Sequence, residues 1–370
     1  MKALLLLISF MNLPCFFISA QTMLSEKTAY YPRVIRLQHS RDFNGRLIAS
    51  FDNGNKGTFY ESKDSGATWN YISSISENTP PRNCCSDIYE VPQQQNNISE
   101  GDLFWATSVG TDHKQRSNCS IRIYKSTDHA RTWNFFSIAV TGSIGLWEPS
   151  FFMDNKNELV MFFSSEEYKS AGYNQIIAHK VSTDGGSTWS DDVYDVAIND
   201  NQMRPGMPTV VRLQDGTYIM CYEVCGRNCD TYIRTSSDGN NWGNPADLGT
   251  RVESTEGNHF SHAPTISLSE DGKLFIVGQV LNKNSDNAIA ENNGKIFMMN
   301  SNNGKGLWTE MHVPVASPSD GSNPCENYSS QLLPSTDGKK VLELALKRTN
   351  DGCRLFYNSG DLNSAMKQKK

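Results

Sequence analysis

Two carboxylates, Glu148 and Glu223, are the residues whose type and setting could do chemistry. Each directly follows an aromatic residue, Trp147 and Tyr222 respectively. Hydrolysis of a glycosidic bond commonly needs two carboxyl groups, one to protonate the leaving oxygen and one to attack the anomeric carbon or activate water. An apolar wall beside a carboxyl group keeps it protonated, so that it can act as the acid. The alternative is that both are ordinary carboxylates bonded to the backbone or to arginine.

The elements that must position these residues are marked by a recurring turn, S-x-D-x-G-x-T-W. The copies are Ser62–Trp69, Ser126–Trp133, Ser182–Trp189, Ser236–Trp242 and Ser301–Trp308. The second lacks only the glycine, the fourth is one residue short, and the fifth has Asn303 in place of the Asp. In such a turn the Asp accepts hydrogen bonds from amides and the Gly takes a positive φ. Intervals of about 50 to 70 residues between the Trp residues predict an array of small sheets.

The chain divides into six units, each opening with a strand-like segment. The openings lie near Tyr30, Cys85, Glu148, Met207, Ala263 and Tyr328. Alternating polarity and turn residues predict antiparallel strands, and helices should be few because no long apolar segment has a period of 3.6. The sequence therefore predicts an all-β fold, a six-bladed β-propeller of four-stranded antiparallel blades with Asp-box turns. Its first strands should line a central channel, and their leading ends are where chemistry is expected.

Composition and charge narrow the class of protein. Residues 1–20 read as a signal peptide, residues 21–360 as the propeller, and residues 361–370 as a flexible basic tail. The apolar run of the signal segment is too short and too interrupted for a permanent membrane anchor. A net charge of −6 argues against nucleic acid or an anionic membrane as partner. We expect a secreted monomer without a cofactor.

The cysteines support an oxidising compartment. Eight of the nine remain once Cys15 leaves with the signal peptide, and an even number predicts disulfide bonds. We predict that Cys325 pairs with Cys353, and that Cys119 pairs with Cys84 or Cys85. Pairing among Cys221, Cys225 and Cys229 stays open. A zinc site at this last group is the alternative, and no paired C-x-x-C or histidine spacing accompanies it.

Three sequons, at Asn97, Asn118 and Asn327, permit glycosylation. Asn327 directly precedes Tyr328, a residue with an expected functional role, so we predict that it is unmodified. The sequence has no Gly-rich phosphate loop, no H-E-x-x-H and no nucleophile elbow. No metal-centred mechanism is therefore indicated.

The recurring turn resembles the Asp box, or bacterial neuraminidase repeat, of the sialidase superfamily. Three segments, Trp147-Glu-Pro, Arg204-Pro-Gly-Met-Pro and Tyr222-Glu-Val-Cys, resemble glycoside hydrolase family 93, the exo-arabinanases of that superfamily. The similarity runs from about Tyr30 to Phe356 and includes the segment Cys84-Cys-Ser-Asp. It implies a retaining exo-glycosidase that releases arabinobiose from linear α-1,5-arabinan.

The resemblance also implies roles for individual residues. Glu148 and Glu223 match the two catalytic glutamates of the family, and Tyr328 matches the tyrosine that is the nucleophile in sialidases. Glu223 is then the nucleophile, because it matches the glutamate that partners that tyrosine, and Glu148 is the acid/base. Motif identity leaves the reverse order open. Trp147, Tyr222 and Tyr31 either stack on sugar faces or pack between blades.

The number of arginines near the channel distinguishes a sialylated substrate from a neutral one. Sialidases use three arginines to clamp the substrate carboxylate. Arg33 matches the first of them, and Arg204 opens the fourth unit near the channel. The fifth unit opens with Ser261-His262, where a further arginine would be expected. The incomplete clamp favours a neutral polysaccharide or oligosaccharide as substrate. His262 either binds a hydroxyl group of that substrate or has the structural role of capping the strand.

Two alternatives stay open. One is an exo-α-sialidase with Tyr328 as nucleophile, Glu223 as its activator and Arg33 in the clamp. Asp87 is then the nearest candidate for the acid/base, in a poor position. The other is a non-catalytic propeller that binds glycan or protein, since fold alone does not decide function.

Overall fold

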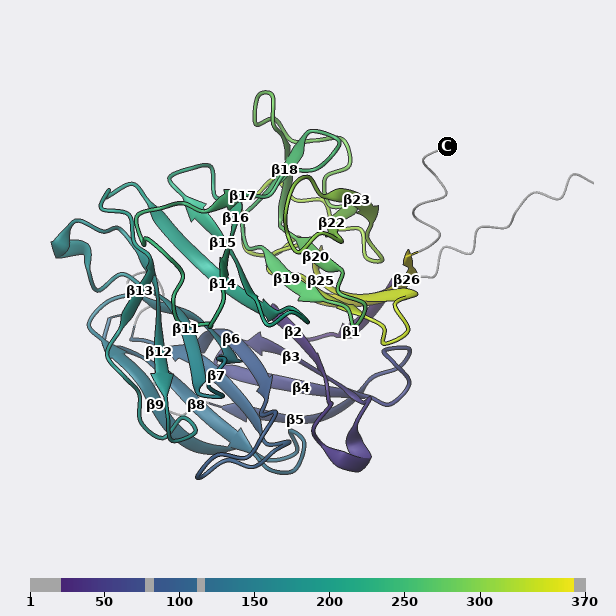
Figure 1. The fold of residues 1–370 in the computed structure, drawn as a ribbon. Coiled ribbons are helices and arrows are strands. Elements are labelled where there is room, and N and C mark those ends of the chain that lie inside the picture. Colours follow the sequence, from purple (N-terminus) through teal and green to yellow (C-terminus); the bar gives the residue numbers. More distant parts are fainter. Residues whose placement is uncertain (1–20, 77–82, 112–116, 363–370) are drawn as a thin grey trace, which may run out of the picture.

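The computed structural model describes residues 21–76, 83–111 and 117–362, so the predicted signal peptide and most of the basic tail lie outside it. Six antiparallel sheets stand in a ring, with the first strand of each innermost (Figure 1). These first strands contact one another in a closed circle. The predicted all-β, six-bladed propeller is confirmed. No helix in the described part of the chain is long and apolar enough to cross a membrane.

The first three blades follow one plan of four sequential strands. Blade 1 consists of β2 (Tyr30–Arg36), β3 (Leu47–Asn53), β4 (Lys56–Ser62) and β5 (Asn70–Ser76). Blade 2 consists of β6 (Asn83–Glu90), β7 (Leu103–Val109), β8 (Cys119–Ser126) and β9 (Asn134–Gly142). Blade 3 consists of β10 (Leu146–Met153), β11 (Leu159–Ser165), β12 (Ile176–Ser182) and β13 (Val193–Val196). Two short 3-10 helices, η1 (Arg41–Phe43) and η2 (Lys169–Ala171), lie in connections.

The other three blades depart from the plan in two places. Blade 4 consists of β14 (Arg204–Arg212), β15 (Tyr218–Cys225), β16 (Asp230–Ser236) and β17 (Thr250–Arg251). Blade 5 consists of β19 (Thr265–Leu268), β20 (Leu274–Val277), β22 (Ile296–Asn300) and β23 (Thr309–His312). A ribbon of β18 (Asn258–Ser261) and β21 (Val280–Lys283) extends from it and pairs with β16 (Figure 1). Blade 6 consists of β24 (Gln331–Pro334), β25 (Lys340–Thr349), β26 (Gly352–Asp361) and β1 (Thr22–Ser25).

The ring is closed by the N-terminal strand. β1 pairs antiparallel with β26 and so completes the last blade from the other end of the chain. The core is divided accordingly, because the six buried apolar clusters each lie between two neighbouring blades. Sheets in a propeller have few exposed edges and bury both faces against their neighbours. This explains why the inner strands β7 and β11 are buried throughout.

The Asp boxes are structural turns between the third and fourth strands. In the first box the Asp64 carboxylate accepts from the Thr68 amide at 2.9 Å, and the Gly66 amide donates to the Ser62 hydroxyl at 2.8 Å. The same pattern recurs at Asp128, Asp184 and Asp238. Because third strands run parallel to first strands within a blade, the boxes lie at the opposite end of the blades from the leading ends of the first strands.

Three disulfide bonds form in the described residues. They join Cys84 to Cys85, Cys225 to Cys229 and Cys325 to Cys353. The Cys325–Cys353 prediction is confirmed, whereas the pairing of Cys119 is wrong. Cys119 lies on β8 and is separated from Cys84 by β7, a spacing of roughly 10 Å that no disulfide spans. Cys119 and Cys221 are buried and lie outside these three disulfide bonds.

The disulfides should differ in their effect on stability. Cys325 and Cys353 are 28 residues apart, so we expect replacing both with Ser to lower the free energy of unfolding by about 3 kcal/mol, because the bond constrains the unfolded chain. The Cys84–Cys85 bond joins adjacent residues and closes almost no loop, so the matched Ser pair should cost much less. Urea unfolding of both oxidised double variants measures this. Equal losses would contradict the expectation.

Two of the three sequons offer an exposed asparagine. Asn97 and Asn118 lie on the surface. Asn327 is buried and donates from Nδ2 to the Gly278 carbonyl at 2.8 Å. In the folded chain its amide is therefore committed to a structural hydrogen bond, in keeping with the prediction that it is unmodified.

Candidate active site

In every blade a residue with positive φ lies at the leading end of the first strand or just before it. The six residues are Tyr31 (48°), Cys85 (61°), Glu148 (58°), Met207 (59°), Ala263 (47°) and Ser329 (54°). In blades 1 to 4 they coincide with a shift in strand register, that is, a β-bulge, which re-aims side chains. Left-handed backbone at non-glycine residues stores strain and clusters at functional sites. The six positions surround one end of the channel, and the predicted catalytic residues lie there.

Glu148 is held rigidly at this end of blade 3. Its side chain is buried, and Oε2 accepts from the Ser164 hydroxyl and from the Met207 backbone amide, both at 2.7 Å. Ser164 lies on the second strand of the same blade, and Met207 lies at the bulge of the next. Oε1 has no hydrogen-bond donor among the described residues. The carboxyl group is thus fixed by one oxygen and offers the other.

Glu223 is arranged in the same way one blade further on. It lies near the end of β15, is buried, and accepts at Oε2 from the Ala263 amide at 2.6 Å. Oε1 lies 3.6 Å from the sulfur of Cys225, which carries no proton in its disulfide. Burial, and then the nearby Glu148 charge, raise the pKa of Glu223 to about 7, against the opposing effects of the Ala263 amide and Arg204.

A carboxylate in blade 1 shows what a purely structural role looks like. Asp52 lies opposite Tyr30 in the strand pair, as Glu223 lies opposite Gly206. Both carboxylate oxygens of Asp52 accept from Ser86, one from its amide and one from its hydroxyl. Glu223 uses one oxygen for the equivalent bond between blades. The second oxygen is what distinguishes it from a structural carboxylate.

Two tyrosines complete the group. The Tyr31 and Tyr328 hydroxyls are 3.4 Å apart, with their rings perpendicular at a centroid distance of 5.5 Å. Burial raises the pKa of Tyr328, and the charges of Glu223 and Glu148 raise it further. The same causes, together with Tyr328, raise the pKa of Tyr31. Both hydroxyls therefore stay neutral and can donate to a ligand or to a carboxylate.

Arg33 is buried, and its Nη1 and Nε contact protein groups. It donates to the Ser329 hydroxyl at 2.9 Å and to the Pro32 carbonyl at 2.8 Å, and it lies 3.5 Å from the Asp87 carboxylate. Burial raises the pKa of Asp87 to about 6, although Arg33 opposes this. Through these contacts Arg33 of blade 1 joins Asp87 of blade 2 to Ser329 at the start of blade 6.

Trp147 and Arg204 share one partner, Glu166, which the sequence reasoning missed. The Glu166 carboxylate Oε1 accepts from the Trp147 indole N–H and from the Arg204 guanidinium, each at 3.1 Å. Both catalytic candidates, Glu148 and Glu223, raise the pKa of Arg204, so its guanidinium lies near them. One signal in the sequence could have indicated Glu166. It is a carboxylate that directly follows the second strand of the third unit, the strand that pairs with the segment containing Trp147 and Glu148.

Tyr222 is not brought to the site. Its side chain is fully buried in the core between blades 3 and 4, and its hydroxyl donates to the Leu248 carbonyl at 2.6 Å. Successive side chains on a strand point to opposite faces. Since Glu223 points toward blade 5 and the channel, its neighbour on β15 must point toward blade 3. Its predicted stacking on sugar is replaced by packing between blades.

His262 lies beside the site on the strand that enters blade 5. Its amide donates to the Cys229 carbonyl at 2.9 Å, and burial lowers the pKa of its half-buried ring. His262, Cys225 and Cys229 lie close enough to share a metal ion, but here the two cysteines are joined in a disulfide bond. The ring is therefore a neutral polar group at the rim of the site.

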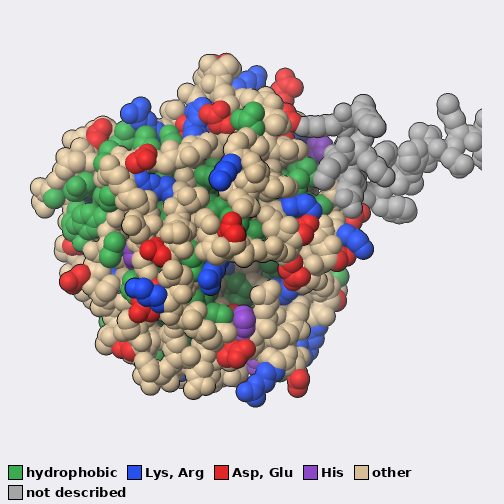
Figure 2. Space-filling view, in the orientation of Figure 1, with side chains coloured by type: hydrophobic (Ala, Val, Ile, Leu, Met, Phe, Trp, Pro, Cys, Tyr) green, Lys and Arg blue, Asp and Glu red, His purple; other side chains and the backbone are tan. Residues whose placement is uncertain are grey.

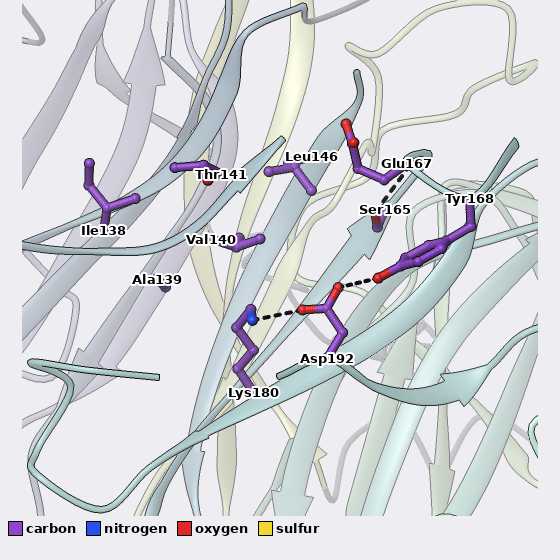
Figure 3. Close-up of a pocket in the computed structure, with 10 residues that line it drawn as sticks. All are labelled: Ile138, Ala139, Val140, Thr141, Leu146, Ser165, Glu167, Tyr168, Lys180 and Asp192. Carbon is purple, nitrogen blue, oxygen red and sulfur yellow. Dashed lines mark hydrogen bonds and ion pairs between the residues drawn. The ribbon is translucent and has the colours of Figure 1, made fainter. Parts of the chain in front are cut away.

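A separate cavity of about 550 Å³ opens on the outside of blades 2 and 3 (Figure 3). Its polar side chains are paired with one another: Asp192 binds Lys180 at 2.8 Å and the Tyr168 hydroxyl at 2.6 Å. None of the predicted site residues lines it. Charged side chains of both signs are spread over the face shown in Figure 2 without a large patch of one sign.

Comparison with solved structures shows the same fold. An α-L-arabinanase of Penicillium chrysogenum, solved with arabinobiose, matches with a TM-score of 0.77 and 23% identity over 93% of this chain and 98% of that one. The GH93 α-L-arabinofuranosidase of Fusarium graminearum matches with a TM-score of 0.75 and 20% identity over 94% and 98%. A Hadza microbial sialidase matches with a TM-score of 0.62 and 11% identity over 91% and 66%.

No curated protein matches the sequence. A family model described as a BNR repeat-like domain matches residues 44–228, which contain the first three Asp boxes and both candidate glutamates. The match covers half of the chain, and the six-bladed propeller agrees with the sialidase-superfamily fold that the sequence resembles. The chain belongs to the family of proteins with a BNR repeat-like domain.

Proposed function

We propose that this protein is a glycoside hydrolase whose catalytic pair is Glu148 and Glu223. The observation that carries the proposal is that the two side chains are held by the same arrangement of hydrogen bonds. Two buried carboxyl groups on adjacent blades are each fixed through Oε2 by a backbone amide of the next blade, while Oε1 has no donor among the described residues. Glycoside hydrolysis requires two such groups, one charged and one protonated, across the scissile bond.

The arginines support a neutral substrate. Arg33 is committed to Ser329 and Asp87, and Arg204 is committed to Glu166. A sialidase would need such guanidinium groups free to bind the substrate carboxylate. Together with the resemblance to family 93, this favours the exo-release of short sugars from α-1,5-arabinan over the release of sialic acid. Three disulfides and the predicted signal peptide support action outside the cell.

The reaction follows from the pair. One carboxylate attacks the anomeric carbon while the other carboxyl group protonates the departing glycosidic oxygen, and water then cleaves the glycosyl ester with the second group as base. The resemblance makes Glu223 the nucleophile. In the free protein, however, burial and the Glu148 charge raise the pKa of Glu223 to about 7, a direction that favours the protonated form expected of the acid.

The first experiment is an activity screen of the mature protein on linear arabinan and on sialyllactose. We expect arabinobiose from the first and no product from the second. Release of sialic acid would overturn the argument from the engaged arginines. No product from either, combined with binding on a glycan array, would replace the enzyme with a glycan-binding propeller.

Tyr328→Phe separates the two enzymatic candidates. If a glutamate is the nucleophile, losing the hydroxyl removes about one hydrogen bond, and kcat on arabinan should fall by roughly tenfold. A tyrosine nucleophile would instead make the variant inactive. Tyr31→Phe, which removes the partner hydroxyl at 3.4 Å, is the matched control and should have a similarly small effect. Steady-state kinetics of both variants give the answer.

A further inference from the structure

Glu166 occupies a central position that the catalytic scheme does not use. It follows β11 and is buried, although its partners reach the surface. Its Oε1 binds Trp147 on blade 3 and Arg204 on blade 4, and its Oε2 binds Lys169. One carboxylate therefore joins an indole, a guanidinium and an ammonium group beside the catalytic pair.

The two groups held through Oε1 are partly exposed at the mouth of the site. The Arg204 side chain is 33% exposed, and Trp147 is half-buried. An indole face suits the apolar side of a sugar ring, and a guanidinium suits hydroxyl or carboxylate oxygens. Without Glu166, the formal charges of Arg204 and Lys169 would sum to +2 beside the catalytic pair. With Glu166 bound to both, that sum falls to +1 and the Arg204 guanidinium is paired.

We propose that Glu166 is a positioning and specificity-determining residue, which sets Trp147 and Arg204 as one wall of the substrate site and neutralises Arg204 so that neutral glycans are accepted over anionic ones. This rests on the proposed function and names the substrate class of that site. The ligand selected against is a sugar carboxylate, such as a uronic acid.

The neighbouring residue supplies a matched control. Glu167 points to the outer cavity shown in Figure 3 and binds the Ser143 hydroxyl at 3.0 Å. Glu166 and Glu167 therefore have the same charge and adjacent positions, yet face different sides of blade 3. A change at Glu167 should leave the Trp147–Arg204 wall intact.

The test compares Glu166→Gln with Glu167→Gln. Binding of arabinobiose and of D-galacturonate is measured by titration calorimetry, and kinetics are measured on arabinan. For Glu166→Gln we expect galacturonate to bind at least tenfold more tightly than to wild type, KM on arabinan to rise several-fold, and kcat to change less than KM. For Glu167→Gln we expect wild-type values. Equal galacturonate affinity in the two variants would overturn the proposal.

A second variant, Glu166→Asp, distinguishes the effect of the carboxylate charge from the effect of its position, and it also controls for a folding defect in Glu166→Gln. Glu166→Asp keeps the negative charge but withdraws it by one methylene from Trp147 and Arg204. It should raise KM without any gain in galacturonate affinity. A gain equal to that of Glu166→Gln would refute the role of charge. Galacturonate binding does not depend on turnover. If the wild type were inactive on arabinan, the proposed activity on that substrate would fail, and the comparison of galacturonate affinities would still test the role of Glu166.

Discussion

Glu148→Gln and Glu223→Gln are each expected to lower kcat on linear arabinan by about two to four orders of magnitude. The amide keeps the shape of the side chain and can still accept the backbone hydrogen bond at one atom. It can neither attack the anomeric carbon as an anion nor donate an acidic proton, and loss of either step typically costs about 10²–10⁴ in rate. Initial rates with the purified variants, alongside circular dichroism to verify folding, measure the effect.

Asp52→Asn is the matched control for Glu223→Gln. Asp52 occupies the equivalent position in blade 1 and accepts bonds from Ser86 of the next blade. Its loss should lower stability while kcat stays within a few-fold of wild type. If Asp52→Asn were as inactive as Glu223→Gln, the glutamate would matter for joining blades rather than for chemistry.

Azide assigns the roles within the pair. In a variant that lacks the nucleophile, azide attacks in its place and gives a glycosyl azide of inverted configuration. In a variant that lacks the acid/base, azide cleaves the glycosyl-enzyme ester and gives the retained anomer. Glu148→Ala and Glu223→Ala, assayed with an activated aryl arabinofuranoside, should give opposite anomers. The inverted product from Glu223→Ala would establish Glu223 as the nucleophile.

The sequence predicted the propeller and the candidate pair because both depend on local patterns. Each Asp box is complete within a short stretch of sequence, and the two glutamates lie at the leading end of a first strand and the trailing end of a second. What it did not predict depends on contacts between distant segments. The pairing of β1 with β26 and the meeting of Trp147 with Arg204 at Glu166 join residues from different strands or blades.

Two errors had physical reasons already available in strand geometry. Tyr222 and Glu223 are adjacent on β15, and alternation allows only one of them to face the site. Cys84 and Cys119 lie on strands with β7 between them, which sets them beyond the reach of a disulfide. Neither error could be seen before the register and order of the strands were known.

Glu343→Gln is expected to stabilise the protein at pH 8. Glu343 is fully buried on β25, and its Oε2 accepts from the Val315 amide at 2.7 Å, while Oε1 has no partner among the described residues. Burial raises the pKa of Glu343 to about 8 from an ordinary 4.5, against the opposing effect of that amide. Between these values the unfolded chain releases a proton that the folded chain keeps. Stability therefore falls as pH rises through this window and levels off above about 8.

The size of the effect follows from the width of that window. At about 1.4 kcal/mol per pH unit, the amide should make the variant more stable than wild type at pH 8 by on the order of 4 kcal/mol, with a much smaller difference near pH 5. Urea unfolding at pH 5, 6, 7 and 8 tests this. Glu100→Gln, at a side chain that is 60% exposed, should run parallel to wild type. A constant difference at every pH would show that the charge of Glu343 is not responsible.

The same variant separates the pH dependence of catalysis from that of folding. Glu343 accepts a hydrogen bond from the Val315 amide, where blade 6 meets the segment that follows β23 (Thr309–His312). The raised pKa of Glu223, about 7, predicts a change in activity near neutral pH, where wild type is also losing stability. In Glu343→Gln the loss of stability is reduced, whereas the titration of Glu223 is unchanged. If activity depends on pH in the same way in Glu343→Gln as in wild type, that dependence is therefore caused by the catalytic pair and not by unfolding.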